Sequence, residues 1–179
     1  MRKSFTGQVM LACAALAAVP AAAQDQAATS AQIAEAIEAC EAVTSIDKVE
    51  FRRLESLGFP TAEKRGNNRG RNKVIGAHQK PGNPVLVVIA DQQVDDKTCL
   101  VRVKLAATSD YAPTLQGLSE IIGMPVRADN FTYFWTLDGH ELRVDPAGDA
   151  KEPVARFQIS AIAPSAAPTT SDDQQETAQ

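Results

Sequence analysis

The chain has 179 residues, of which 44% are hydrophobic and 22% are charged, and its formal net charge is −4. A chain of this length accommodates one domain with a single hydrophobic core. Nothing in this mildly acidic balance suggests a general polyanion binder such as a protein that coats nucleic acid, although basic residues are concentrated locally.

Residues 1–23 are predicted to form a secretory signal peptide. Arg2 and Lys3 supply a positive n-region, Val9 to Val19 an Ala/Leu/Val-rich stretch, and Ala21 to Ala23 a small-residue cleavage site. The apolar run is about eleven residues long, well short of the roughly 20 that span a bilayer. We therefore expect an exported protein, periplasmic or secreted, with no stable membrane span.

Cys13 offers a competing interpretation of this leader as a lipoprotein signal, because it follows Leu11 and Ala12. It lies inside the apolar stretch, so cleavage before it would leave almost no hydrophobic region. We interpret Cys13 as a small apolar residue of a segment that is removed.

Removal of the leader leaves two cysteines, Cys40 and Cys99. Two cysteines in an oxidising compartment are expected to form a disulfide. The alternatives are a metal-binding pair and a reactive thiol. A metal site would need two further ligands, and the sequence has no CxxC or HxxxH pattern to supply them.

After a flexible lead-in at 24–28, the sequence predicts one domain over residues 29–159. Thr29 and Gln32 have the spacing of a capping box, and Ile33, Ile37 and Cys40 follow on one helical face.

A second capping-box pattern, Asp47 with Glu50, precedes Phe51, Leu54 and Leu57 at helical spacing. Gly58 is a natural C-terminal cap, and Pro60 prevents continuation. We expect two short helices, or one kinked helix, over about residues 30 to 57.

Three strands are predicted next. Residues 74–77 form a weak strand, and residues 85–89 form an apolar run without alternation, which is typical of a central strand covered on both faces. Residues 99–105 alternate, which places Cys99 on an inward face. A Cys40–Cys99 disulfide would therefore join a helix to the sheet.

The second half begins with a helix marked by Leu115, Leu118 and Ile122, entered near Pro113 and ended by Gly123. A hairpin follows, in which Phe131, Tyr133 and Trp135 alternate with polar residues and Asp138-Gly139 forms a two-residue turn. The predicted register pairs Leu137 with His140, Trp135 with Leu142, and Tyr133 with Val144. We interpret Phe131, Tyr133 and Trp135 as core.

Residues 146–149 are predicted to turn the chain into a last strand at 154–159. The fold class is thus α+β, a mainly antiparallel sheet of about five to six strands with helices on one face, in the order α(α)βββ-αβββ. The two α-βββ halves show no residue-level repeat. Residues 160–179 are rich in Ala, Pro, Ser, Thr and Gln and are expected to form a disordered tail.

Basic residues are concentrated in one loop, namely Lys64, Arg65, Arg69, Arg71 and Lys73. Their side chains, together with glycine-freed backbone amides, could hold phosphate or carboxylate groups of an envelope component or an acidic protein. Gly and Asn at turn positions are also typical of a hydrophilic connector, which is the interpretation we favour.

Phe134 points away from the aromatic core face of the hairpin. If that face of the sheet carries no helix, Phe134 and the neighbouring Arg143 become candidates for contact with a partner.

Catalytic and metal signatures are not found in the sequence. His78 and His140 are its only histidines, and a metal site would require both to converge with a carboxylate such as Asp138 or Asp145. No GxSxG, SxxK or phosphate-binding glycine loop occurs. We expect no catalytic residue, no metal and no cofactor.

The sequence therefore favours a small exported, non-enzymatic binding or interaction protein that contacts an envelope component or a protein, and not nucleic acid. Two alternatives stay open: a periplasmic hydrolase with its site in a cleft between the two halves, and a purely structural envelope protein. The identity of the partner and the oligomeric state are not predicted.

Overall fold

The computed structural model describes residues 27–62, 74–90 and 97–163. Its helices are α1 (Ser30–Val43), α2 (Arg52–Ser56) and α3 (Tyr111–Ile122), the last preceded by a 3-10 turn, η1 (Thr108–Asp110). Its strands are β1 (Val74–His78), β2 (Leu86–Ala90), β3 (Thr98–Lys104), β4 (Arg127–Asp129), β5 (Thr132–Leu137), β6 (His140–Gly148) and β7 (Pro153–Ala161). The predicted signal peptide, the basic loop and residues 164–179 of the predicted tail lie outside the described residues.

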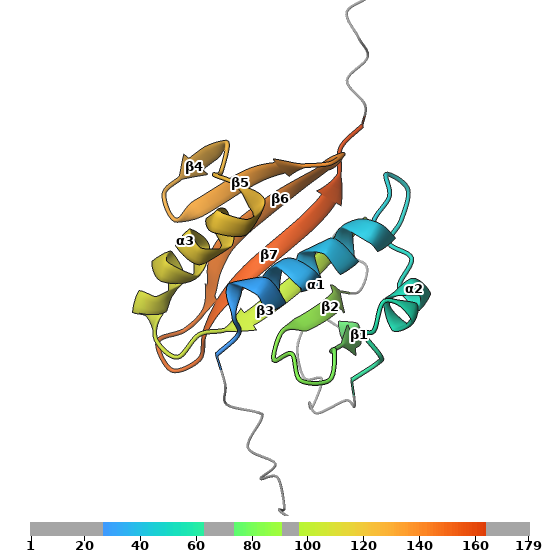
Figure 1. The fold of residues 1–179 in the computed structure, drawn as a ribbon, viewed down its shortest axis with the longest axis horizontal. Helices are drawn as coiled ribbons and strands as arrows, with labels where there is room; N and C mark the ends of the chain where they lie inside the picture. Colours follow the sequence, from blue (N-terminus) through green and yellow to red (C-terminus); the bar gives the residue numbers. More distant parts are fainter. Residues whose placement is uncertain (1–26, 63–73, 91–96, 164–179) are drawn as a thin grey trace, which may run out of the picture.

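The strands form one antiparallel sheet in the order β1-β2-β3-β7-β6-β5-β4 (Figure 1). The predicted α+β class with an antiparallel sheet is confirmed, but the expected five to six strands are too few, because the sheet has seven. The strand that was missed is β4, whose three residues are too short to show an alternating pattern. Two meanders, β1 to β3 and β4 to β7, meet where β3 pairs with β7.

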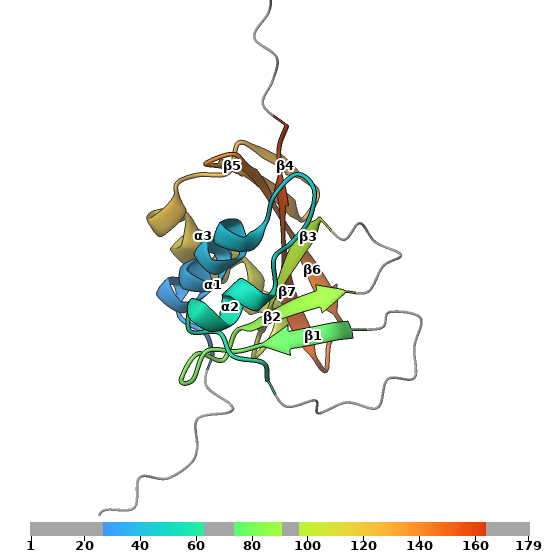
Figure 2. The ribbon, with the colours of Figure 1, turned by 90° about the vertical axis from the view of Figure 1, so that its right-hand side faces the viewer.

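Helices α1, α2 and α3 lie on one side of the sheet (Figure 2). α1 packs against β2, β3, β7 and α3. The core between helices and sheet takes its largest side chains from both layers: Trp135, Phe59, Phe157, Ile33, Ile37, Leu54, Leu118, Leu142 and Ile159. Burial of these apolar side chains is the main favourable contribution to the stability of the fold.

The predicted capping box at the start of α1 is confirmed. The backbone N–H of Gln32 donates to Thr29 Oγ1 at 3.2 Å, and the backbone N–H of Thr29 donates to Gln32 Oε1 at 2.9 Å. The helix beyond it buries Ile33, Ile37 and Cys40 against the sheet. The capping box therefore starts α1, and the helical period that follows places Cys40 on the face that packs against the sheet.

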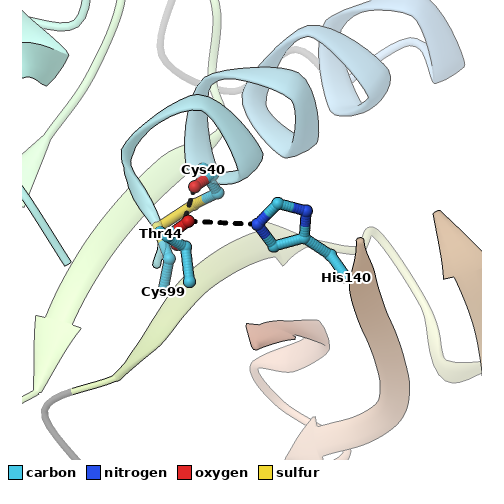
Figure 3. The surroundings of a disulfide bond; sticks show 4 residues. All are labelled: Cys40, Thr44, Cys99 and His140. Atoms are coloured by element: carbon cyan, nitrogen blue, oxygen red, sulfur yellow. Dashed lines mark hydrogen bonds between the residues drawn. A yellow bond between two sulfur atoms is a disulfide. The ribbon is translucent and has the colours of Figure 1, made fainter. Parts of the chain in front are cut away.

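Cys40 on α1 and Cys99 on β3 form the predicted disulfide, with their Cα atoms 5.7 Å apart (Figure 3). Both residues are fully buried. The bond joins the helix layer to the sheet layer, as the shared inward faces of the two elements predict.

His140 on β6 connects the end of α1 to the β5–β6 hairpin beside this disulfide (Figure 3). Its Nε2 lies 3.1 Å from Thr44 O, and its Nδ1 lies 2.8 Å from Asp138 O. Both partners are carbonyl oxygens, which only accept, so a neutral imidazole donates to one of them and an imidazolium to both. Thr44 Oγ1 in turn donates to Cys40 O at 2.7 Å.

The second predicted capping box, Asp47 with Glu50, is wrong. α2 begins at Arg52 with Phe51 at its N-cap position, and no side chain caps it. The Glu50 carboxylate pairs instead with Lys48 at 3.1 Å and with Arg53 at 3.5 Å, while its backbone N–H donates to Val43 O. Asp47 and Glu50 therefore lie in the turn between α1 and α2 and do not cap a helix.

Three details of the strands also differ from expectation. β2 lies second from the edge of the sheet and is not central. β6 continues through Pro146 to Gly148, so the turn falls at 149–152, where Asp149 Oδ1 accepts from the backbone N–H groups of Lys151 and Glu152. β7 extends to Ala161, two residues into the predicted tail, because its register with β6 continues to His140.

Candidate functional site: the open face of the sheet

One face of the sheet carries none of the described helices, and we call it the open face (Figure 2). Directly paired residues of antiparallel strands point to the same face. Leu86 pairs with Arg102, Arg102 with Arg156, and Arg156 with Asp145, so these four form one row across β2, β3, β7 and β6. The neighbouring row on the same face consists of Val88, Leu100, Gln158, Arg143, Phe134 and Arg127.

Asp145 lies at the centre of the open face and is only 6% exposed. Arg156 donates to its Oδ2 from Nε at 3.0 Å and from Nη2 at 2.5 Å, and Gln158 Nε2 donates to its Oδ1 at 2.9 Å. Arg143 Nε lies 3.6 Å from Oδ1. A single buried carboxylate therefore orients two guanidinium groups.

Both guanidinium-bearing side chains stay accessible although Asp145 is covered. The side chains of Arg143 and Arg156 are 48% and 43% exposed. Each guanidinium has five N–H donors in a rigid fork, and Asp145 occupies at most two of them on either arginine. Carboxylate and phosphate oxygens are the acceptors that such unbonded guanidinium donors bind best.

Further cations extend this group along the sheet. Arg102 lies directly opposite Arg156, and Lys104 follows two residues later on the same face of β3. Both are exposed, and among the described residues neither has a carboxylate within ion-pair distance. Toward the β4 edge of the same face, the Arg127 guanidinium carbon lies 3.8 Å from the ring centroid of Phe134.

The open face therefore has an excess of positive charge in a chain whose net charge is negative. Its strands place five cationic side chains there, Arg102, Lys104, Arg127, Arg143 and Arg156, against the carboxylates of Asp129, Glu141 and Asp145. Since Asp145 is buried and satisfied, the accessible groups near the centre of the face are mainly guanidinium donors. We call Arg102, Arg143 and Arg156 with Asp145 the arginine cluster.

The predicted contact residues Phe134 and Arg143 lie on this face, as neighbours in register. Phe134 is half-buried, because the Arg127 guanidinium covers its ring. The other predicted binding element, the loop of Lys64, Arg65, Arg69, Arg71 and Lys73, lies outside the described residues.

The expectation that Phe131 belongs to the core is wrong, since this residue is 70% exposed. It lies in the β4–β5 turn after Asn130, whose φ of 53° reverses the chain, and not in the alternating strand. Its carbonyl accepts a hydrogen bond from the Tyr111 hydroxyl at 2.8 Å. Burial raises the pKa of that hydroxyl, and the Asp145 charge raises it further.

The two histidines are placed apart and are both engaged by the backbone. His78 is buried on β1, with Nδ1 3.0 Å from Phe59 O, whereas His140 contacts Thr44 and Asp138. Within the described ranges no group of three or more His, Cys, Asp or Glu residues has metal-binding geometry.

Sequence reasoning missed Asp145, Arg156 and Arg102 as members of a site. A signal existed in the strand pattern, because an alternating strand with arginines at its outward positions places those arginines together on the outer face. Which strands are neighbours cannot be read from alternation alone, so the arginines on β3, β6 and β7 could not be placed side by side.

No protein-family model matches the chain, and no curated protein or solved structure matches it either. None of the helices in the described part of the chain has both the length and the apolar character needed to cross a membrane.

Proposed function

We propose that the chain is a small exported binding protein that uses the open face of its sheet to hold an anionic partner. Export follows from the leader at 1–23 and agrees with the buried Cys40–Cys99 disulfide, since such bonds persist in oxidising compartments. We place the protein in the periplasm or outside the cell.

The observation that carries this proposal is the arginine cluster. Arg102 and Arg156 are directly paired, and Arg143 lies in the neighbouring row on the same face. The buried Asp145 carboxylate holds Arg156 and Arg143 in place. Mutual repulsion makes adjacent cations unfavourable unless something compensates it, and a bound anion supplies that compensation. Preoriented donors also reduce the entropy lost on binding.

The partner is expected to present several carboxylate or phosphate groups along an extended surface. The cationic positions span β3, β7, β6 and β4, so a partner that contacts them all must cross several strands. Guanidinium groups bind planar carboxylates and phosphates through paired N–H donors. The half-buried Phe134 provides an apolar contact within the same surface.

Binding to two anionic probes tests this proposal, with the mature chain from residue 24 onward. Poly-L-glutamate represents a carboxylate partner, and vesicles containing phosphatidylglycerol represent a phosphate surface. We expect binding to at least one probe that weakens as salt is raised, because exposed ion pairs are screened.

Charge reversal locates the site. The double variant Arg102→Glu/Arg143→Glu should lower affinity about tenfold or more, since it replaces two attractive contacts by repulsive ones. Arg52→Glu, at an exposed position of α2 on the helix side of the sheet, is the control and should bind like the wild type. Equal loss in both variants, or no binding to either probe at low salt, would contradict the proposal.

A further inference from the structure

The strand β4 forms one edge of the sheet, and each of its three residues is exposed. The opposite edge is partly covered, because Ala62 N donates to Ala77 O at 2.7 Å and Thr61 forms a bridge with His78 on β1. Among the described residues no comparable bridge covers the outer side of β4. An uncovered strand edge presents N–H and C=O groups that can pair with another strand.

The most exposed large hydrophobic residues of the described part of the chain lie close to β4 in sequence. They are Met124 at 78%, Phe131 at 70%, Val126 at 68% and Ile121 at 51%. All four belong to the segment that leads from the last turn of α3 into β4 and out through the β4–β5 turn (Figure 1). Exposed apolar groups gathered beside an open strand edge are typical of an interface.

The charges of β4 are complementary to those of a second copy of β4. Its sequence is Arg127-Ala128-Asp129. When two such strands run antiparallel about a two-fold axis at Ala128, Arg127 of each copy lies directly opposite Asp129 of the other. Opposite charges in directly paired positions favour that register, and like charges oppose it.

The backbone of β4 suits the same pairing. Asp129 pairs with Thr132 across a two-residue turn and Arg127 pairs with Phe134, so these residues direct their backbone groups toward β5. Alternation then directs the N–H and C=O of Ala128 toward the outer edge. The methyl side chain of Ala128 leaves room for close approach at the axis.

We propose that two copies of this protein associate through β4, with Ala128 facing Ala128 and the two sheets joined into one. The interface is isologous, because the same surface of each copy forms both halves. The exposed apolar side chains of residues 121–131 are then covered beside the joined strands. This inference does not depend on the anion-binding proposal, because it rests on the edge of the sheet and not on the arginine cluster.

Analytical ultracentrifugation of the mature chain over about 1 to 200 µM measures the association. We expect the wild type to shift from monomer to dimer as its concentration rises. Ala128→Pro removes the outward N–H at the axis without removing a bond to β5, and it should stay monomeric throughout. A wild type that is monomeric over the whole range would overturn the proposal.

Charge exchange tests the register itself. Arg127→Asp and Asp129→Arg should each place like charges opposite one another and each stay monomeric. An equimolar mixture of the two variants restores opposite charges at both positions, so it should form a mixed dimer about as readily as the wild type. Failure of the mixture to associate, while both variants show the wild-type circular dichroism spectrum, would contradict the register.

A matched control separates this surface from the arginine cluster. Arg102→Asp makes the same kind of charge change on β3, which β7, β6 and β5 separate from β4. It should leave the dimer intact while weakening binding to the anionic probe. Ala128→Pro should do the reverse. Loss of dimer in Arg102→Asp would show that association does not proceed through β4.

Discussion

Asp145 on β6 and Arg156 on β7 are directly paired on the open face. The Arg156 guanidinium donates two hydrogen bonds, of 3.0 and 2.5 Å, to Asp145 Oδ2. Asp145 is buried, whereas the Arg156 side chain is 43% exposed. The carboxylate is therefore a fixed anchor beneath a guanidinium that stays accessible to a partner.

Removal of this anchor should destabilise the fold. Asp145→Ala leaves Arg156, Arg143 and Gln158 without their shared acceptor, and we expect a loss of about 1 to 3 kcal/mol because the arginines are partly solvated. Urea denaturation measures the change. Glu141→Ala, which removes an exposed carboxylate on the same face, should change stability by less than about 0.5 kcal/mol. Similar losses in both variants would show that Asp145 is not an anchor.

The Cys40–Cys99 disulfide should contribute strongly to stability because it closes a long loop. The cysteines are 59 residues apart in sequence, and in the chain-entropy model a loop of that size corresponds to about 4 kcal/mol. We expect Cys40→Ala/Cys99→Ala to unfold at a clearly lower urea concentration than the wild type, and the wild type to match it once reduced. Two free thiols in protein recovered from an oxidising compartment would contradict the assignment.

Gly148 should tolerate no side chain. It has a φ of 78°, and a Cβ atom there would lie 2.1 Å from the carbonyl oxygen of Glu152. We expect Gly148→Ala to cost roughly 3 kcal/mol, from the left-handed backbone and from the displacement of the β6–β7 turn.

Gly82→Ala is the matched control for that substitution. Gly82 has a φ of 79°, but a Cβ atom there would meet nothing within 4 Å. The control should therefore cost only about 1 kcal/mol, the backbone contribution alone. Equal losses of thermal stability in the two variants would show that the contact with Glu152 is relieved without cost.

Glu41 should make the folded state less stable as pH rises. Burial raises its pKa, the charges of Glu38 and Asp138 raise it further, and His140 opposes the shift. The folded protein thus keeps a proton that the unfolded chain releases near its ordinary pKa of 4.5. The stability contribution is present below that value and is lost as pH rises through the folded-state pKa.

The unfolding free energy of Glu41→Gln, measured between about pH 4 and pH 7, tests this dependence. The variant should gain stability relative to the wild type toward pH 7, since it has no buried charge to form. Glu120→Gln removes one carboxylate at an exposed position of α3 and should follow the wild-type pH profile. A wild-type advantage that grows toward neutral pH would reverse the assigned sign.

Local patterns predicted several elements correctly for reasons visible in particular residues. Thr29 and Gln32 start α1 because their side chains satisfy backbone donors within one turn. The Asp138-Gly139 turn defined the β5–β6 register, including the pairing of Trp135 with Leu142. Asp47 and Glu50 show the limit of such patterns, because nearby cations and a turn engage Glu50 instead.

By itself, the sequence determined the alternation of the longer strands, the Asp138-Gly139 turn, the inward faces that carry Cys40 and Cys99, and the outward position of Phe134. These properties depend on residues a few positions apart, where helix and strand periods operate. Only the tertiary structure decided that β3 lies beside β7, so that Arg102 lies opposite Arg156, and that β4 forms an uncovered edge. It also brought Arg156 and Arg143 into contact with Asp145. Pairing between distant strands follows from burial of the whole core, which no single stretch of sequence contains.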